Sequence, residues 1–283
     1  MDYQGQFRAA ALAAGFPDDE VGRFLEHLRL TIRLAGGSGD AVAGRAGGLP
    51  HLPAGQDWPA EQGVALPFVF SADCAALPVV DGSSLPADGS LLFFLDHEQD
   101  HLTGAHGRVL HVPAGAGTTA TQPPAPGLVA KEYDLHASLI AELPDWFGPG
   151  DDEDDEDDLS PLQEQLAEDL PNLAELRALA AVLWPRDNGL ATACLGGHVT
   201  DEVITSIAEQ TLAGREKAGE IVVPVANWYS HVEREKYRLA GEWLTLATFA
   251  TTDDLYDGSF VIRADDLAAG HLDRALSVTG FSE

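Results

Sequence analysis

The 283-residue sequence predicts an α+β fold, with a mainly antiparallel sheet and flanking helices. Short apolar runs bounded by Gly, Pro and Asp are typical of strands, and apolar residues spaced three and four apart are typical of helices. A strand–turn–strand pattern also recurs, because Asp88-Gly89-Ser90 in the first half resembles Asp257-Gly258-Ser259 in the second. The recurrence predicts an internal duplication, with coincidence as the alternative because Asp-Gly is a common turn dipeptide.

The first predicted element is a helix within an N-terminal helical segment, residues 1–40. Acidic residues at positions 18–20 suit the positive end of the helix dipole. Apolar residues then follow at helical spacing: Val21, Phe24, Leu25, Leu28 and Ile32. The glycine-rich stretch 36–39 is expected to end this helix.

Residues 41–283 are expected to form one domain with two copies of the pattern, at about 45–150 and 185–283. In the first copy, residues 44–60 are too rich in Gly and Pro for regular structure, and Trp58 is a predicted anchor of this loop. Short apolar runs predict three strands, at residues 66–70, 91–95 and 109–112.

An acidic linker and helices over residues 151–184 join the two copies. Residues 151–158 are all Asp or Glu, and because like charges repel, this run is expected to be solvated. Ser160-Pro161-Leu162-Gln163 is typical of a helix start, with a capping box and Pro at the first helical position. A second helix is predicted to begin near Asn172 and to stop before Pro185.

In the second copy, Thr200 is a predicted helix N-cap with acidic residues after it. Residues 220–240 fit both an extended chain and a helix. The remaining predictions are strands at residues 244–250, 260–263 and 276–279, with a helical turn at 265–269.

The charge of the chain restricts its partners. Its 16 basic residues face 46 acidic ones, for a formal net charge of −30. Binding to nucleic acid or to an anionic membrane surface requires Lys and Arg, so this charge argues against both. It favours cations, a basic protein partner, or solubility alone. Because no secretory signal and no run of about 18 apolar residues is found, we expect a cytoplasmic protein.

Four sequence blocks form a pattern that points to one family. They are GGLPHLPAGQDWP at 47–59, LPADGSLLFFLD at 85–96, LGGHVTDEV at 195–203, and the stretch 242–270 that begins EWLTLATFA. In this order the blocks resemble the YwqG-like family, a family of unknown function. The resemblance covers most of the chain from about residue 45. It implies an α+β fold with antiparallel sheet and a duplicated core, and it implies no established activity.

The chain departs from that family at its core strands, where the family usually carries Gln. The corresponding positions fall near Ser71-Ala72 and Thr248-Phe249, and Val199 replaces a proline of the third block. A polar site that depended on those Gln side chains would be altered here.

His97-Glu98-Gln99-Asp100-His101 is a literal HExxH sequence. On a helix this spacing puts His97 and His101 on one face for zinc, with Glu98 as a base. Here the motif follows a predicted strand, and glycines and another strand come soon after it. A hairpin loop is therefore the expected structure, and no metal or cofactor is predicted.

The candidate binding residues come from the family-like blocks and the recurring turn. His198 follows two glycines, which allow a tight turn or a close backbone approach, and it either faces a cleft or belongs to a structural turn. The candidates are Gly47, Gly48, Pro50, Trp58, Gly197, His198, Trp243, Asp257 and Gly258.

The sequence therefore favours a non-catalytic binding protein, in its most concrete form an immunity-like protein that engages a basic protein partner. Two alternatives stay open: a metal-dependent hydrolase using His97, Glu98 and His101, and a small-molecule sensor with a cleft between the repeats. The oligomeric state is not predicted.

Overall fold

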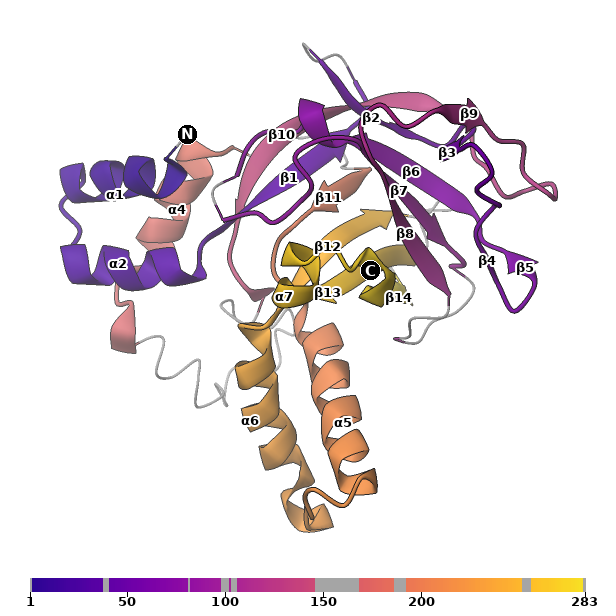
Figure 1. Ribbon diagram of the computed structural model, residues 1–283. Coiled ribbons are helices and arrows are strands. Elements are labelled where there is room, and N and C mark those ends of the chain that lie inside the picture. Colours follow the sequence, from indigo (N-terminus) through magenta and orange to yellow (C-terminus); the bar gives the residue numbers. More distant parts are fainter. Residues whose placement is uncertain are drawn as a thin grey trace.

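The computed structural model describes residues 2–37, 41–80, 82–97, 102, 106–145, 168–185, 192–250 and 256–281. A long antiparallel sheet curls around an apolar core, and two groups of helices lie outside it (Figure 1). The mixed α+β architecture predicted from the sequence is confirmed.

The large sheet holds ten strands in the order β14-β13-β12-β11-β1-β10-β2-β6-β7-β8. Its strands are β1 (Arg29–Ala35), β2 (Val42–Ala46), β6 (Phe68–Asp73), β7 (Ser90–Leu95), β8 (Gly107–Val112), β10 (Tyr133–Glu142), β11 (Ala193–Leu195), β12 (Trp243–Ala250), β13 (Tyr256–Arg263) and β14 (Leu276–Phe281). Two small ribbons pair β3 (His51–Pro53) with β9 (Thr118–Ala120) and β4 (Ala60–Glu61) with β5 (Val64–Ala65).

The strand order is symmetric about the central pair of β1 and β10. On one side β2, β6, β7 and β8 follow one another, and on the other side β11, β12, β13 and β14 do the same. The first run starts at β2, which pairs with β10, and the second run starts at β11, which pairs with β1. Each run therefore lies beside the central strand that does not directly precede it in the sequence. Both runs carry a register shift at the same step, between Phe68 and Phe70 in β6 and between Thr245 and Ala247 in β12.

The two Asp-Gly-Ser segments do not occupy matching places, so their predicted equivalence is wrong in detail. Gly89 lies in the turn before β7 with a φ of +80°, whereas Gly258 lies inside β13 opposite Phe249. Counted from the register shift in each run, Ser90 of β7 matches Asp257 of β13. Ser90 lies opposite Asp73 and Asp257 opposite Ala250, each three pairs beyond the first pair after the shift.

Phenylalanines from both halves fill the inside of the curled sheet. Phe70 and Phe93 stack with ring centroids 4.3 Å apart, and Phe249 meets Phe70 at 5.6 Å. A side chain on Gly107 of β8 would lie 2.5 Å from Phe260, so the two edges of the sheet approach each other closely there. Burial of these large rings supplies much of the stability of the core.

The first group of helices packs on the outside of β1 and β10. It contains α1 (Tyr3–Ala13), α2 (Asp18–His27) and α4 (Leu173–Leu183). Phe7 stacks on Phe24 at 5.0 Å and on Trp184 at 6.3 Å. Glu20, only 2% exposed, accepts hydrogen bonds from both the backbone N and Nδ2 of Asn172, at 2.7 and 2.8 Å, and so holds the start of α4.

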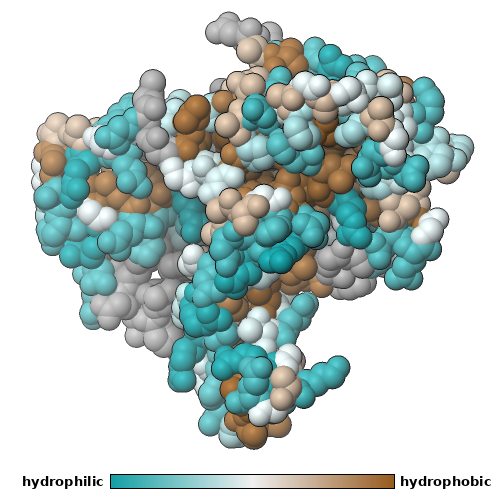
Figure 2. All heavy atoms as spheres, viewed as in Figure 1, coloured by the Kyte–Doolittle hydropathy of each residue, from teal (hydrophilic) through white to brown (hydrophobic). Residues whose placement is uncertain are grey.

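The second group is a helical hairpin that projects from the sheet (Figure 1). It contains α5 (Asp201–Lys217) and α6 (Trp228–Ala240), and the short α7 (Ala264–Ala268) follows β13. Figure 2 shows apolar residues at the tip of the hairpin, where Val222, Val225 and Tyr229 are 86%, 91% and 80% exposed. Among the described helices, none is long and apolar enough to cross a membrane.

The predicted N-terminal helix is wrong beyond His27. The chain turns extended at Leu28, and Ile32 lies in β1 between Leu139 of β10 and Leu195 of β11. Ile32 has the spacing of a helical apolar face that starts at Val21, but Leu30, Ile32 and Leu34 also alternate as in a strand. The segment forms a strand because β1 pairs with a neighbouring strand on each side.

Some other predicted elements are confirmed with different first or last residues, and the predicted cap of α5 is replaced by another contact. Of the residues 220–240, most form α6, and the strand expected over 66–70 lies at Phe68–Asp73. Thr200 stands at the N-cap of α5 but makes no side-chain cap; Oδ2 of Asp145 accepts from the backbone N of Asp201 instead, at 2.6 Å. The acidic run 151–158 and the capping box at Ser160 lie outside the described residues.

Candidate ligand-binding site

A cleft of about 420 Å³ lies where the first helical group meets the sheet. Its walls come from both halves of the chain: α2, β1 and the 82–85 loop from the first half, and the end of β11, the start of β12 and α7 from the second. Much of its lining is apolar, from Leu30, Ile32, Leu195, Leu244 and Leu267. A cleft of this size and lining is typical of small-molecule sites.

Arg29 brings a positive charge to the cleft at the first residue of β1. Its Nη1 donates to the backbone oxygen of Gly197 at 3.3 Å. Among the described residues no carboxylate lies within ion-pair distance of Arg29. Burial lowers the pKa of the Arg29 guanidinium, yet a group so basic stays charged at neutral pH.

Gly197 shapes the wall beside Arg29 because only glycine fits its place. Its φ is +103°, and a Cβ there would lie 2.6 Å from Oε2 of Glu142 and 3.0 Å from Oγ1 of Thr31. Those two side chains are joined by a hydrogen bond of 2.8 Å. The close approach leaves the Gly197 oxygen free to accept from both Arg29 and the backbone N of Thr245.

His198 lies behind the glycines and outside the lining of the cleft. Its Nε2 donates to the backbone oxygen of His27 at 2.8 Å, and its own backbone oxygen accepts from Oγ1 of Thr245 at 2.7 Å. Burial, reinforced by the charge of Arg29, lowers the pKa of His198 to about 3. The imidazole is therefore neutral at pH 7 and ties the end of α2 to the second half of the sheet.

Trp243 lines the cleft at the start of β12, while its ring packs with the cluster beneath α5 and α6. Its indole Nε1 is buried without a hydrogen-bond partner among the described residues. Buried donors are nearly always satisfied in folded proteins, which marks this position as unusual.

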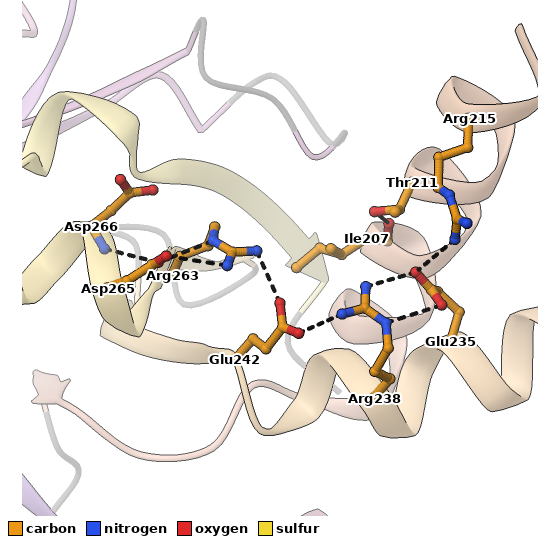
Figure 3. A network of polar contacts seen from close by, with 9 residues as sticks. All are labelled: Ile207, Thr211, Arg215, Glu235, Arg238, Glu242, Arg263, Asp265 and Asp266. Carbon is orange, nitrogen blue, oxygen red and sulfur yellow. Dashed lines mark hydrogen bonds and ion pairs between the residues drawn. The ribbon is translucent and has the colours of Figure 1, made fainter. Parts of the chain in front are cut away.

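A chain of ion pairs fixes the wall that contains Gly241, Trp243 and Ala264 (Figure 3). The carboxylate of Glu242 accepts a hydrogen bond from Nη1 of Arg263 at 3.0 Å and also forms an ion pair with Arg238. The chain extends through Arg263 to Asp265 and through Arg238 to Glu235, at 3.0 and 2.7 Å. These contacts connect α6, the residue just before β12, β13 and α7, and the hydrogen bond from Arg238 lowers the pKa of Glu235.

A second cleft of about 450 Å³ lies on β2, β6 and β7, and its lining includes Gly47, Ser71, Asp73 and His51. Its arginine, Arg45, lies 3.6 Å from Asp134 and 3.9 Å from Glu132, so its charge is balanced.

The sequence-derived candidates are not gathered in one place. Gly197 and Trp243 line the first cleft and Gly47 lines the second, while Gly48 lies against Glu132 with a φ of +68°. The others have structural contacts or lie in the sheet: Pro50 accepts from Thr121, Trp58 donates to the oxygen of Leu66 at 2.8 Å, and Asp257 and Gly258 lie in β13. Trp58 thus anchors its loop, as predicted.

Sequence reasoning missed Arg29. On the helix predicted there, Glu26 and Arg29 would form an ordinary ion pair three residues apart on a solvated face. The signal that remained was the position of Arg29 between Leu28 and Leu30, which does not distinguish a cleft from a surface.

The HExxH sequence lies between β7 and β8, which form a hairpin. His97 stands in the turn after β7, and Glu98 and His101 lie outside the described residues. Within the described part of the chain, no three His, Cys, Asp or Glu side chains are grouped so that they could hold a metal ion.

Comparison with protein families matches residues 44–279 to a domain of unknown function (DUF1963). The match begins after α1, α2 and β1, so Arg29 precedes the matched region. No curated protein matches the chain.

Proposed function

The chain belongs to the DUF1963 family, a domain of unknown function, and we propose that it is a non-catalytic binding protein whose first cleft holds a small organic molecule. The observation that carries this proposal is the pairing of a partly apolar cleft of about 420 Å³ with a single guanidinium, Arg29, that has no carboxylate partner among the described residues. Small-molecule sites combine an apolar lining with a few fixed polar groups in this way.

The polar groups around the cleft support binding over catalysis. Oγ of Ser83 accepts from the backbone N of Leu85 at 3.3 Å, so it stabilises its own turn. His198 is neutral and donates to a backbone oxygen. A nucleophile and its base would instead be hydrogen-bonded to each other.

Thermal-shift screening with a small-molecule library tests the proposal, because a ligand selective for the folded state raises the melting temperature. Leu85→Trp places a large side chain in the lining, and Val79→Trp adds the same ring at an exposed position outside it. Ligands should stabilise the wild type and Val79→Trp but not Leu85→Trp. Equal stabilisation of all three proteins would contradict binding in this cleft.

We also infer that the chain contains a duplicated unit whose first strands, β1 and β10, have changed places. Support comes from the symmetric strand order and the matching register shifts. A glycine pair with positive φ follows both β2 and β11, as Gly47-Gly48 and Gly196-Gly197. The YwqG-like resemblance is consistent with such a duplication and stays a prediction.

The second candidate function is the engagement of a basic protein partner, as an immunity-like protein would do. The net charge of −30 favours it, since long-range attraction would speed such an association and make it salt-dependent. An affinity pull-down washed at low and high salt tests it: a basic protein should be retained at low salt and released at high salt. The hydrolase alternative predicts zinc in the purified protein that is lost in His97→Ala.

A further inference from the structure

Building on the proposed binding function, we infer that the cleft selects an organic monoanion, a carboxylate on an apolar or aromatic body, with Arg29 as the group that recognises it. The inference concerns the chemical class of the ligand, and the proposed cleft can stand without it.

Arg29 differs from other arginines of this acidic chain in its surroundings. Arg8, Arg23 and Arg45 each lie within 4 Å of a carboxylate, at 2.9, 3.1 and 3.6 Å. Arg29 is half-buried, and one backbone oxygen is the only acceptor recorded for it among the described residues. A guanidinium carries five N–H donors in a planar fork that suits a carboxylate, so most of its binding capacity is unused.

Because Arg29 is half-buried, its unused N–H donors favour the binding of an anion. Taking a charge out of water is costly unless a partner compensates for it. The lowered pKa of Arg29 has burial as its cause, and no opposite charge among the described residues offsets it. An incoming carboxylate would form charge-assisted hydrogen bonds, which are stronger than neutral ones.

The charges around the cleft favour a single negative charge on the ligand. His198 is neutral at pH 7, and burial also lowers the pKa of His27, so Arg29 is the cation of this group. Glu26 lines the same cleft and is exposed. A second negative charge on the ligand would meet Glu26 without a second cation to balance it.

The rest of the cleft suits an apolar body attached to the carboxylate. Leu30, Leu244 and Leu267 face it from three elements, and Tyr3 and Trp184 add aromatic rings. About 420 Å³ lies within the range of sites for drug-sized molecules. Aromatic and medium-chain acids meet both requirements.

Isothermal titration with matched acids and amides tests the inference. The probes are naphthalene-2-carboxylate with naphthalene-2-carboxamide, and octanoate with octanamide, which differ in charge and hardly in shape. With the wild-type protein each acid should bind about tenfold or more tightly than its amide. Arg29→Gln should remove that difference, Arg29→Lys should keep part of it, and Arg8→Gln, which alters an exposed paired arginine, should leave it unchanged.

The outcomes separate the two proposals. Equal binding of acid and amide by the wild type would overturn the anion inference and leave the cleft as a binding site. Binding that survives Leu85→Trp would overturn the proposed site itself. The comparison of acid with amide uses the wild type alone, so it decides the inference even if Arg29→Gln does not fold.

Discussion

At the residue scale, His198 shows how a polar side chain acts as a structural link in this protein. Its imidazole is buried and neutral, and it joins the end of α2 to the start of the second helical group through His27. Such a residue is expected to make the stability of the protein depend on pH.

Stability should fall as the pH drops below 6.5. An unfolded histidine takes up a proton near its ordinary pKa of 6.5, whereas His198 in the folded protein resists protonation down to about 3. Between these values the unfolded state binds more protons, so the stabilisation present above pH 6.5 is progressively lost. Urea unfolding at pH 7.5 and 5.0 should show a larger loss for the wild type than for His198→Gln. An equal loss in both would mean that other groups set the pH dependence.

Glu20 is a second residue whose substitution has a definite expected effect on the free energy of unfolding. Glu20→Ala would leave the backbone N and Nδ2 of Asn172 without their acceptors. We expect the free energy of unfolding to fall by about 1–3 kcal/mol. Glu26→Ala, on the exposed face of the same helix, should change it by less than about 0.5 kcal/mol. Urea denaturation compares the two, and similar values would show that the α2–α4 contact contributes little.

At the scale of elements, the glycine pairs after β2 and β11 determine how each run of strands leaves the centre of the sheet. Gly48 has a φ of +68° and Gly197 a φ of +103°, and a Cβ on either would lie within 3 Å of a neighbouring carboxylate oxygen. The two positions are thus constrained in the same way in the two halves.

Alanine at either position should therefore destabilise the fold to a similar degree. We expect a loss of about 2 kcal/mol or more for Gly48→Ala and for Gly197→Ala, from backbone strain and steric overlap. Gly214→Ala is the control, because Gly214 lies in α5 with open space around it, and there alanine should stabilise by about 0.5–1 kcal/mol. Thermal unfolding of the three variants provides the comparison. A tolerated alanine at only one of the two sites would weaken the inferred duplication.

The strands that could be predicted are those with continuous apolar runs. Leu91–Leu95 falls inside β7, and the strands of the C-terminal hairpins were also found from sequence. β10 was not predicted, although Leu135, Ala137 and Leu139 alternate with His136 and Ser138 as in a strand with one apolar face. β11 has three residues, too few to carry any period.

At the scale of the whole molecule, the site depends on pairings between distant parts of the chain. Arg29 and Gly197 are 168 residues apart and meet because β1 pairs with β11. Sequence periodicity identifies a strand but does not say which strand lies beside it. The glycines of the wall could therefore be chosen as candidates, while the charge that faces the cleft could not.

β1 lies between β10, which precedes residue 145, and β11, which follows residue 168, and this arrangement has a consequence for cutting the chain. A break between residues 145 and 168 would leave β1 paired with β10 and β11, and would leave β10 paired with β2. Residues 1–150 and 159–283, expressed as two polypeptides, should therefore assemble by complementation when produced together. Size-exclusion chromatography should recover them as one complex of native size. Residues 1–150 alone would lack β11 beside β1 and the apolar side chains of α4 that pack against α1 and α2, and residues 159–283 alone would lack β1 beside β11, so neither should persist as a folded monomer.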